Sequence, residues 1–440
     1  MNKELYDLAA WSVKTAKSSG ADESRVHISN QRSVEISYRN RKPENIKEAS
    51  TRGLSVEIYV DGRYSVQSTS DLRKNAVTEF ISKAVQTTKL LAEDPYRTLP
   101  EPKYYKGRSD KDLGLVDPDY KNFNPESRHK MVKDIEEACL ERGGDKVISV
   151  TAEEQDSHVE EVLMASNGFE GYSEATVYVA VASMTAKDEG DRRPSDYSYF
   201  VCTDKKEMPD PGQIGAEAAE RTLALLGAKK IKTEKFSIIL ENRQVSRLFG
   251  GFLAAMYGGS IQQKRSFLSD KKEERVGSEY FTVLDDPFIK GGLGSQLYDR
   301  DGFAAKKRDM IKAGILKEFY VDWYYSQKLG WEPTTGSPSN LIILPGKRSV
   351  KEIMKDLGRG VFITGFIGGN SNSTTGDASI GIIGQLFEKG EPVQAVSEMN
   401  IAGNHLKFWQ GLAEAANDPW IYSSFRTPSL VFKDVVVSGL

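Results

Sequence analysis

The sequence contains few of the residues from which disulfide frameworks and metal sites are built. Among its 440 residues are two cysteines, Cys139 and Cys202, and four histidines. Two cysteines exclude a disulfide framework and a cysteine-rich zinc ribbon, and they favour a reducing, cytoplasmic location. The two closest histidines, His129 and His158, are 29 residues apart. The sequence therefore contains no local His-x-His or His-Glu-x-x-His metal motif.

Neither sign of charge dominates the composition. The chain has 60 Lys and Arg residues against 63 Asp and Glu residues, a formal net charge of −3. Basic residues are interleaved with acidic ones, as in residues 271–275, and no basic stripe with aromatic residues occurs. This pattern argues against direct binding of nucleic acid.

Long apolar runs are also missing. The longest nearly apolar stretch, residues 175–184, is about half the length that a membrane-spanning helix needs. The first residues mix acids and bases and lack the apolar core of a signal peptide. We expect neither secretion nor a membrane segment.

The first 94 residues predict an N-terminal α+β domain. Apolar residues recur at helical spacing from Leu5 to Ala16, and alternation over residues 24–64, with a turn at Asp61-Gly62, predicts antiparallel strands. A second helix is predicted over residues 70–91. Residues 95–125 hold five of the sixteen prolines and are the best candidate for a linker.

The same order of elements is predicted again over residues 126–228. A helix over residues 126–142, strands over 146–200 and a helix over 212–226 follow one another, with a turn at residues 166–168. A helix, a sheet and a second helix, present twice, suggest an internal duplication of the N-terminal half. Residues 126–228 would form a central α+β domain.

Residues 229–440 predict a β-rich C-terminal domain. Short apolar runs separated by glycine-rich turns indicate strands over residues 236–240, 341–344, 361–364, 380–387 and 430–437. We therefore assign the chain to the α+β class, with mostly antiparallel sheets and flanking helices.

Two common catalytic motifs are missing from the sequence, so clusters of acidic residues are the next candidates for a functional site. No phosphate-binding Walker loop and no Gly-x-Ser-x-Gly elbow occurs. Asp285, Asp286 and Asp299 could bind a hard cation, exchange protons or contact a peptide. The alternative is that these aspartates only form turns, since Asp285-Asp286 precedes a proline and Asp301-Gly302 is a hairpin signal.

The segment from Gly365 to Asp377 is rich in glycine and small polar residues. Its backbone N–H groups could contact an anion or an extended peptide, or the segment could be a flexible surface loop between two strands. The candidate peptide-binding or partner-binding residues here are Gly365, Gly368, Gly369, Asn370 and Ser371. For His405 we favour a structural or solvent-facing role.

One helix is predicted to pack and to carry no metal ligand. Apolar residues at Val245, Leu248, Phe249, Phe252, Leu253 and Met256 form one uninterrupted face, which Gly258-Gly259 ends.

The order of several motifs resembles the TldD/PmbA family, also described as modulators of DNA gyrase. The matching stretches cover nearly the whole chain: Gly20-Ala21-Asp22, residues 53–71, Ser166-Asn167-Gly168, Ser266-Phe267-Leu268, residues 283–287 and 298–302, Gly314-Ile315-Leu316, residues 337–341, Leu344-Pro345-Gly346, Pro392-Val393, residues 400–404 and 435–439.

The resemblance implies a division of labour between two types of chain. TldD-type members are similar to metallopeptidases with a His-Glu-x-x-x-His helix and a C-terminal cysteine, whereas PmbA/TldE-type members lack these ligands. In this sequence the metal helix would correspond to about residues 245–256, where Val245, Phe249 and Ala254 mark the degenerate ligand region, and no cysteine follows Cys202.

The resemblance therefore implies a chain with no catalytic residue and no bound cofactor. Zinc or a similar metal is expected on a TldD-like partner, and the pair would process small or unfolded peptides. Two alternatives stay open. One is a stand-alone homodimeric peptide-binding module. The other is a metal-independent hydrolase that uses Asp285, Asp286 and Asp299.

Overall fold

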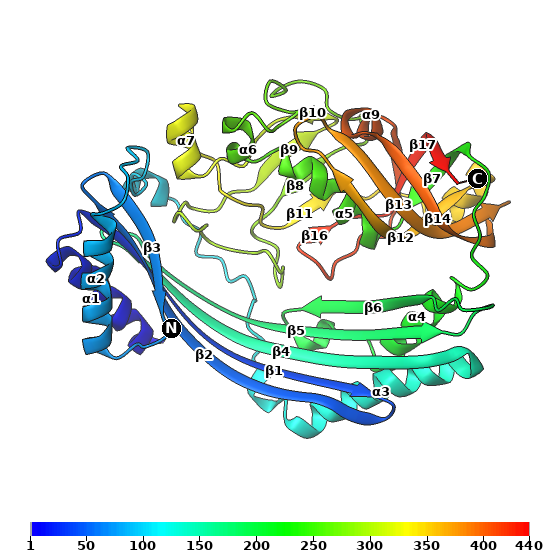
Figure 1. The fold of residues 1–440 in the computed structure, drawn as a ribbon, viewed down its shortest axis with the longest axis horizontal. Coiled ribbons are helices and arrows are strands. Elements are labelled where there is room, and N and C mark those ends of the chain that lie inside the picture. The colour runs from blue at the N-terminus through cyan, green and yellow to red at the C-terminus, as the bar shows by residue number, and fades with distance from the viewer. Residues whose placement is uncertain (1, 440) are drawn as a thin grey trace.

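A long curved sheet lies beneath a β-rich C-terminal region in the computed structural model, which describes residues 2–439 (Figure 1). The sheet has six antiparallel strands in the order β3-β2-β1-β4-β5-β6. Their bounds are β1 Glu23–Arg39, β2 Lys42–Val60, β3 Arg63–Thr69, β4 Val147–Ala165, β5 Glu170–Ala186 and β6 Ser195–Cys202. The predicted N-terminal and central regions therefore share one sheet.

Four helices cover the convex face of this sheet in two pairs (Figure 1). They are α1 Lys3–Ser18, α2 Lys74–Thr88, α3 Pro125–Gly143 and α4 Pro211–Leu223. Along β1 the even-numbered residues face the helices: Val26 and Ile28 pack with α1 and α2, while Val34 and Ile36 pack with α3 and α4. The order helix, three strands, helix occurs twice, as predicted, and the antiparallel pairing of β1 with β4 joins the two copies.

The C-terminal region contains two further sheets. A five-stranded sheet, β10-β9-β8-β11-β16, is formed by β8 Val283–Asp285, β9 Arg308–Lys312, β10 Ile315–Leu316, β11 Leu341–Ile343 and β16 Phe425–Arg426. A six-stranded sheet, β14-β13-β12-β7-β17-β15, is formed by β7 Glu234–Leu240, β12 Arg359–Ser371, β13 Asp377–Glu388, β14 Glu391–Asn404, β15 Leu412–Ala415 and β17 Leu430–Ser438. An extra β14–β17 pairing curls this sheet into a barrel-like form.

Five helices accompany these sheets: α5 Asn242–Ala254, α6 Gly258–Gln262, α7 Trp323–Leu329, α8 Val350–Leu357 and α9 His405–Gln410. Most strand pairs are antiparallel, and β12–β7 and β11–β16 are parallel. The largest core surrounds α5, whose predicted apolar face is buried, with Val245, Leu248, Phe249 and Phe252 each at most 3% exposed. The α+β class with mostly antiparallel sheets is thus confirmed.

The proline-rich residues 95–125 are packed against both regions. This segment contains two short 3-10 helices, Pro102–Tyr105 and Tyr120–Asn122, and no strand. Its Thr98 accepts a hydrogen bond from Trp323 Nε1 in the C-terminal region, at 2.9 Å. Its Leu115 carbonyl accepts the Thr176 N–H of β5, at 2.9 Å. The segment therefore helps to fix the C-terminal region over the sheet.

The expected loop over residues 365–376 is mostly strand, which corrects that prediction. Strand β12 continues to Ser371, and Asn370 and Ser371 pair with Ser379 and Ala378 of β13. Bulges interrupt the pairing, and Gly368 and Gly369 adopt φ of 63° and 102° there. Glycine adopts such angles at little cost, so a composition typical of loops is compatible with a bulged strand.

Within residues 2–439, no helix combines the length and the apolar character needed to cross a bilayer.

Candidate functional site

Helix α5 lies over the concave face of the curved sheet (Figure 1). A groove of about 490 Å³ is lined by residues of this helix and of the sheet. Side chains from three elements line it: Val179 and Val181 of β5, Tyr197 and Tyr199 of β6, and Arg243, Gln244, Ser246 and Arg247 of α5. The alternation of the strands explains this lining. Even-numbered residues such as Tyr178, Ala180 and Phe200 are buried against α3 and α4, so their odd-numbered neighbours face the groove.

Arg243, at one end of the groove, is held by the protein itself. Its side chain is 7% exposed and forms an ion pair with Glu217 of α4. Its guanidinium also lies 3.9 Å from the ring centroid of Trp420. Burial is the main cause that lowers the pKa of Arg243 below its ordinary value, and Glu217 opposes this effect. Arg243 therefore joins the sheet layer to the C-terminal region.

Arg247 lies one helical turn further along α5 and is exposed. Its Nη2 donates to the Gly368 carbonyl at 3.0 Å, and its Nη1 donates to the Phe366 carbonyl at 3.5 Å. No Asp or Glu side chain within residues 2–439 forms an ion pair with it. The groove thus contains a guanidinium whose charge no carboxylate neutralises.

The glycine-rich candidates lie beside α5 on β12. Gly368 contacts Arg247 through its carbonyl, while Ser371 Oγ lies 2.7 Å from His405 Nε2. Gly251 of α5 approaches the same pair, since a Cβ atom there would lie 2.7 Å from His405 Nε2. Gly365 and Asn370 pair with β13, and Gly369 lies in the bulge between Ile367 and Asn370. This segment therefore presents a carbonyl to the groove's arginine.

Ser371 and His405 resemble part of a catalytic triad only in their distance. His405 is 1% exposed, and burial lowers its pKa to about 4, so its imidazole is neutral at pH 7. Its Nδ1 has no hydrogen-bond partner within residues 2–439, and its ring stacks on Phe267. A triad needs a third group on that nitrogen to orient the base. The pair is better described as a contact that fixes the end of β12 against α9, which agrees with the structural role favoured for His405.

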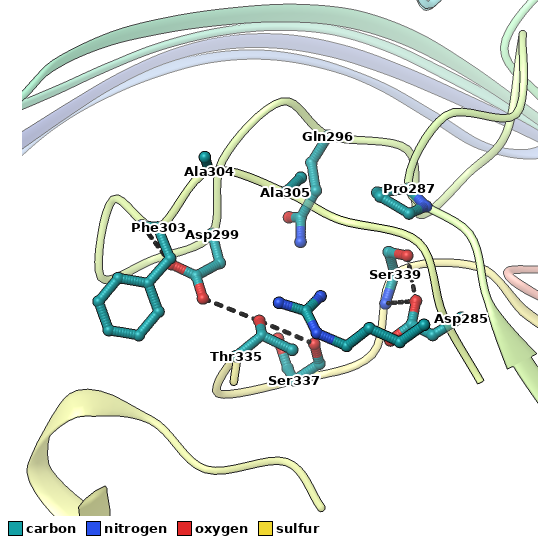
Figure 2. Close-up of a pocket in the computed structure, with 11 residues that line it drawn as sticks. Asp285, Pro287, Gln296, Asp299, Phe303, Ala304, Ala305, Thr335, Ser337 and Ser339 are labelled. Atoms are coloured by element: carbon teal, nitrogen blue, oxygen red, sulfur yellow. Dashed lines mark hydrogen bonds between the residues drawn. The ribbon is translucent and has the colours of Figure 1, made fainter. Parts of the chain in front are cut away.

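The predicted aspartates lie in another place, at the end of strand β8 in the five-stranded sheet and in the loop that follows it. Asp285 and Asp299 lie at opposite ends of a small polar pocket (Figure 2). Its volume is about 10 Å³, which is close to the least that holds one water molecule. Asp286 instead pairs with Lys307 at 2.8 Å. A pocket of this size has no room for a peptide.

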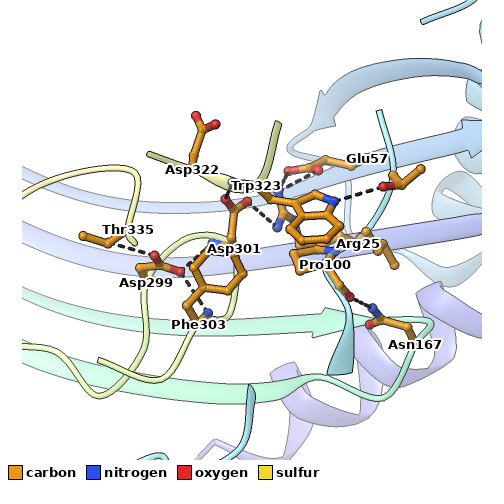
Figure 3. Close-up of polar contacts among 12 residues, drawn as sticks. Arg25, Glu57, Pro100, Asn167, Asp299, Asp301, Phe303, Asp322, Trp323 and Thr335 are labelled. Carbon is orange, nitrogen blue, oxygen red and sulfur yellow. Dashed lines mark hydrogen bonds and ion pairs between the residues drawn. The ribbon is translucent and has the colours of Figure 1, made fainter. Parts of the chain in front are cut away.

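Both buried aspartates are satisfied by neighbouring donors. Asp285 accepts hydrogen bonds from the Ser339 N–H and hydroxyl and from Tyr320 Oη. Asp299 accepts from Thr335 Oγ1 at 2.8 Å and from the Phe303 N–H at 2.9 Å (Figure 3). Burial raises the pKa of Asp299 to about 6, and the nearby Asp301 adds to the effect. Such a network fixes the surrounding loops.

Asp301 extends this network to the curved sheet (Figure 3). It pairs with Arg25 of β1 at 3.0 Å and accepts the Trp323 N–H at 2.9 Å. Arg25 also pairs with Glu57 of β2 at 2.9 Å. The aspartate motif is thus part of a junction between two layers. Sequence reasoning missed Arg25 because its partner Asp301 is 276 residues away.

Helix α5 does not carry residues that fit a metal. Val245 and Phe249 are at most 1% exposed in the core, Ala254 is half-buried, and no His, Cys, Asp or Glu occurs from Asn242 to Ala254. Across residues 2–439, no group of three or more His, Cys, Asp or Glu side chains is placed to hold a metal ion. The donor set of a zinc peptidase is therefore not matched by this helix.

Comparison with known proteins agrees with the resemblance found in the sequence. Residues 26–87, 118–226 and 233–439 match domain 1, the central domain and the C-terminal domain of the PmbA/TldA metallopeptidases. Metalloprotease PmbA of Escherichia coli O157:H7 is 29% identical over 98% of this chain and 94% of its own length.

Two solved structures share the fold. A candidate modulator of DNA gyrase from Bacteroides thetaiotaomicron is 35% identical, with a TM-score of 0.97 and full coverage of both chains. TldE from Thermococcus kodakarensis superimposes with a TM-score of 0.88 at 20% identity, over 98% of this chain and 100% of its own. With all three of the family's domains matched in order, this chain belongs to the PmbA/TldD metallopeptidase family.

Proposed function

We propose that this chain is a non-catalytic, PmbA/TldE-type subunit of a TldD/TldE-type metallopeptidase complex that processes small or unfolded peptides. The observation that carries the proposal is helix α5. At the place where the family's metal helix is expected, one face is buried and apolar, and no His, Cys, Asp or Glu occurs from Asn242 to Ala254. A TldD-like partner would supply the metal, and this chain would supply surface for the peptide.

A location in a reducing compartment such as the cytoplasm is part of the proposal. Cys139 and Cys202 are both buried and unpaired. Burial raises the pKa of each thiol to about 12, so neither is a reactive thiolate at neutral pH.

A second candidate function is a stand-alone peptide-binding module. The observation in its favour is that the groove combines two tyrosines with Arg247, which pairs with no carboxylate among residues 2–439. A metal-independent hydrolase based on the aspartates has less support, because Asp285 and Asp299 enclose a water-sized space and are already hydrogen-bonded.

The test is peptide cleavage by the chain alone, by a TldD-like partner alone and by the two together, with metal analysis of each. We expect the lone chain to hold no stoichiometric metal and to cleave neither casein nor short peptides. The mixture should form a stable complex by size-exclusion chromatography and cleave peptides in a chelator-sensitive way. Cleavage by the lone chain that resists chelator would refute the proposal, and so would failure of the two chains to associate.

A further inference from the structure

We propose that the groove between α5 and strands β5 and β6 binds an extended peptide through a carboxylate, and that Arg247 is the residue that binds it. This inference deepens the proposed function and rests on it for the nature of the ligand as a peptide. The ligand's carboxylate would come from its C-terminus or from an acidic side chain.

Arg247 differs from Arg221 and Arg243 in the partners of its guanidinium. Arg221 of α4 pairs with Glu241 at 2.5 Å and with Asp196 at 3.3 Å. Arg243 pairs with Glu217. Arg247 has carbonyl oxygens as its only hydrogen-bond acceptors among residues 2–439. The region therefore neutralises two guanidinium groups internally and leaves the third one, which faces the groove, with its full charge.

The Arg247 guanidinium keeps N–H donors that can bind a ligand. A guanidinium has five N–H donors in a fixed fork. The Gly368 and Phe366 carbonyls take one donor from each terminal nitrogen, which leaves three. Because both carbonyls belong to β12, they hold the guanidinium from one side. A carboxylate that enters the groove can take the free donors in a bidentate contact.

The strand side of the groove is apolar and aromatic. Tyr197 is 48% exposed, and its ring centroid lies 5.9 Å from that of Tyr199. These rings and the two valines of β5 give apolar and aromatic surface to the side chains of a ligand. The volume of about 490 Å³ lies within the roughly 300–1,000 Å³ of small-ligand pockets. The site thus combines an anion-binding group with an apolar wall.

The test uses the full-length chain and fluorescein-labelled tetrapeptides of alanine and phenylalanine, with fluorescence anisotropy as the readout. The peptide is made with a free C-terminus, with an amidated C-terminus, and amidated with one internal aspartate. We expect the free acid, the aspartate peptide or both to bind at least tenfold more tightly than the neutral amide. Which of the two binds more tightly identifies the source of the carboxylate.

Single-residue variants test which side chain of the groove binds the carboxylate. Arg247→Gln should abolish the preference for a carboxylate, and Tyr197→Ala should weaken all three peptides by a similar factor of about five, because it removes aromatic contact without touching the charge. The matched control is Arg265→Gln, an exposed arginine outside the groove, which should bind as the wild type does. Thermal melting of each variant shows whether it is folded.

Equal binding of acid and amide, a wild-type preference in folded Arg247→Gln, or no binding of any peptide overturns the inference. Size-exclusion chromatography with a TldD-like partner separates this outcome from a failure of the proposed function. Association and cleavage without a carboxylate preference would refute only the groove's role. A carboxylate preference without association would refute the proposed complex and favour the stand-alone module.

Discussion

Two clusters of charged residues lie between the curved sheet and the C-terminal region, and they differ in whether carboxylates pair with the arginine. At the junction of Arg25, Glu57 and Asp301, the cation has two carboxylate partners, and all three side chains are at most 20% exposed. At the groove, Arg247 is exposed, and its only acceptors among residues 2–439 are carbonyl oxygens. The first cluster is closed and holds the layers together, whereas the second is open to a ligand.

The difference shows that a cluster of acidic residues is a weak sign of function until its partners are known. The sequence predicts candidate site residues at Asp285, Asp286 and Asp299, yet each of them is satisfied by hydrogen bonds or an ion pair. The mark of Arg247 in the sequence is a second arginine one helical turn before it, which is ordinary on a helix. What distinguishes it is that it lines a groove and pairs with no carboxylate among residues 2–439.

The largest expected effect comes from breaking the closed cluster. Arg25→Ala would leave Glu57 and Asp301 close together without their cation, so we expect the free energy of unfolding to fall by about 3 kcal/mol. Differential scanning calorimetry would show a lower Tm. Because Asp301 belongs to the C-terminal region, the melting of the two layers should also separate.

A second arginine on the same strand is the control. Arg32 pairs with Glu48, but these side chains are 42% and 61% exposed. Arg32→Ala should therefore cost less than about 1 kcal/mol. Equal losses for the two variants would contradict the view that the Arg25 cluster is the structural junction.

Local patterns predicted the elements of the fold well. The helical spacing from Leu5 to Ala16 became α1, and the alternation after Ser24 became β1 and β2. These patterns arise because one face of each element is buried, and burial is visible in neighbouring residues. The union of two predicted regions into one sheet was not visible, since the β1–β4 pairing depends on contacts between residues more than 100 positions apart.

The groove could be found only in part for the same reason. Arg247 meets Phe366 and Gly368, which lie 119 and 121 residues further along the chain. The one local signal was the spacing of Arg243 and Arg247, four residues apart and so on the same face of a helix. With no acidic residue between them, that face carried unbalanced positive charge.

The domain boundaries at residues 94, 125 and 228 stay predictions.

Glu154 of β4 differs from both clusters, because its carboxyl group is buried but has no hydrogen-bond partner among residues 2–439. The residue is 1% exposed. Its pKa is raised to about 9, mainly by burial and also by the nearby Asp156, while Arg128 and Lys205 oppose the shift. The folded protein therefore keeps a proton on Glu154 that the unfolded chain releases above its ordinary pKa of about 4.5.

This difference makes the wild type less stable as pH rises. Between about pH 4.5 and pH 9 the folded state binds more protons at Glu154, so its contribution to stability falls with increasing pH. Glu154→Gln removes the titration. The free energy of unfolding of the variant minus that of the wild type should therefore rise by about 2 kcal/mol from pH 5 to pH 7. Urea unfolding at several pH values measures this gain. A constant offset between the two proteins across that range would contradict it.

The smallest effects are expected at the glycine that lets α5 approach β12 closely. A Cβ atom at Gly251 would lie 2.7 Å from the buried ring of His405 and 2.8 Å from Ser371 Cβ. Gly251→Ala should therefore push the helix from the strand, lower the free energy of unfolding by about 1 kcal/mol, and weaken the contact of Arg247 with Gly368.

Its neighbour gives the matched control, because a Cβ atom at Gly250 meets nothing within 4 Å. Gly250→Ala should raise stability by up to about 1 kcal/mol, since alanine favours the helix more than glycine does. Chemical denaturation measures both variants, and the anisotropy assay with the free-acid peptide shows whether Arg247 has moved. If Gly251→Ala were as stable as Gly250→Ala and bound the peptide equally well, the close approach of α5 to β12 would not be what positions the open arginine.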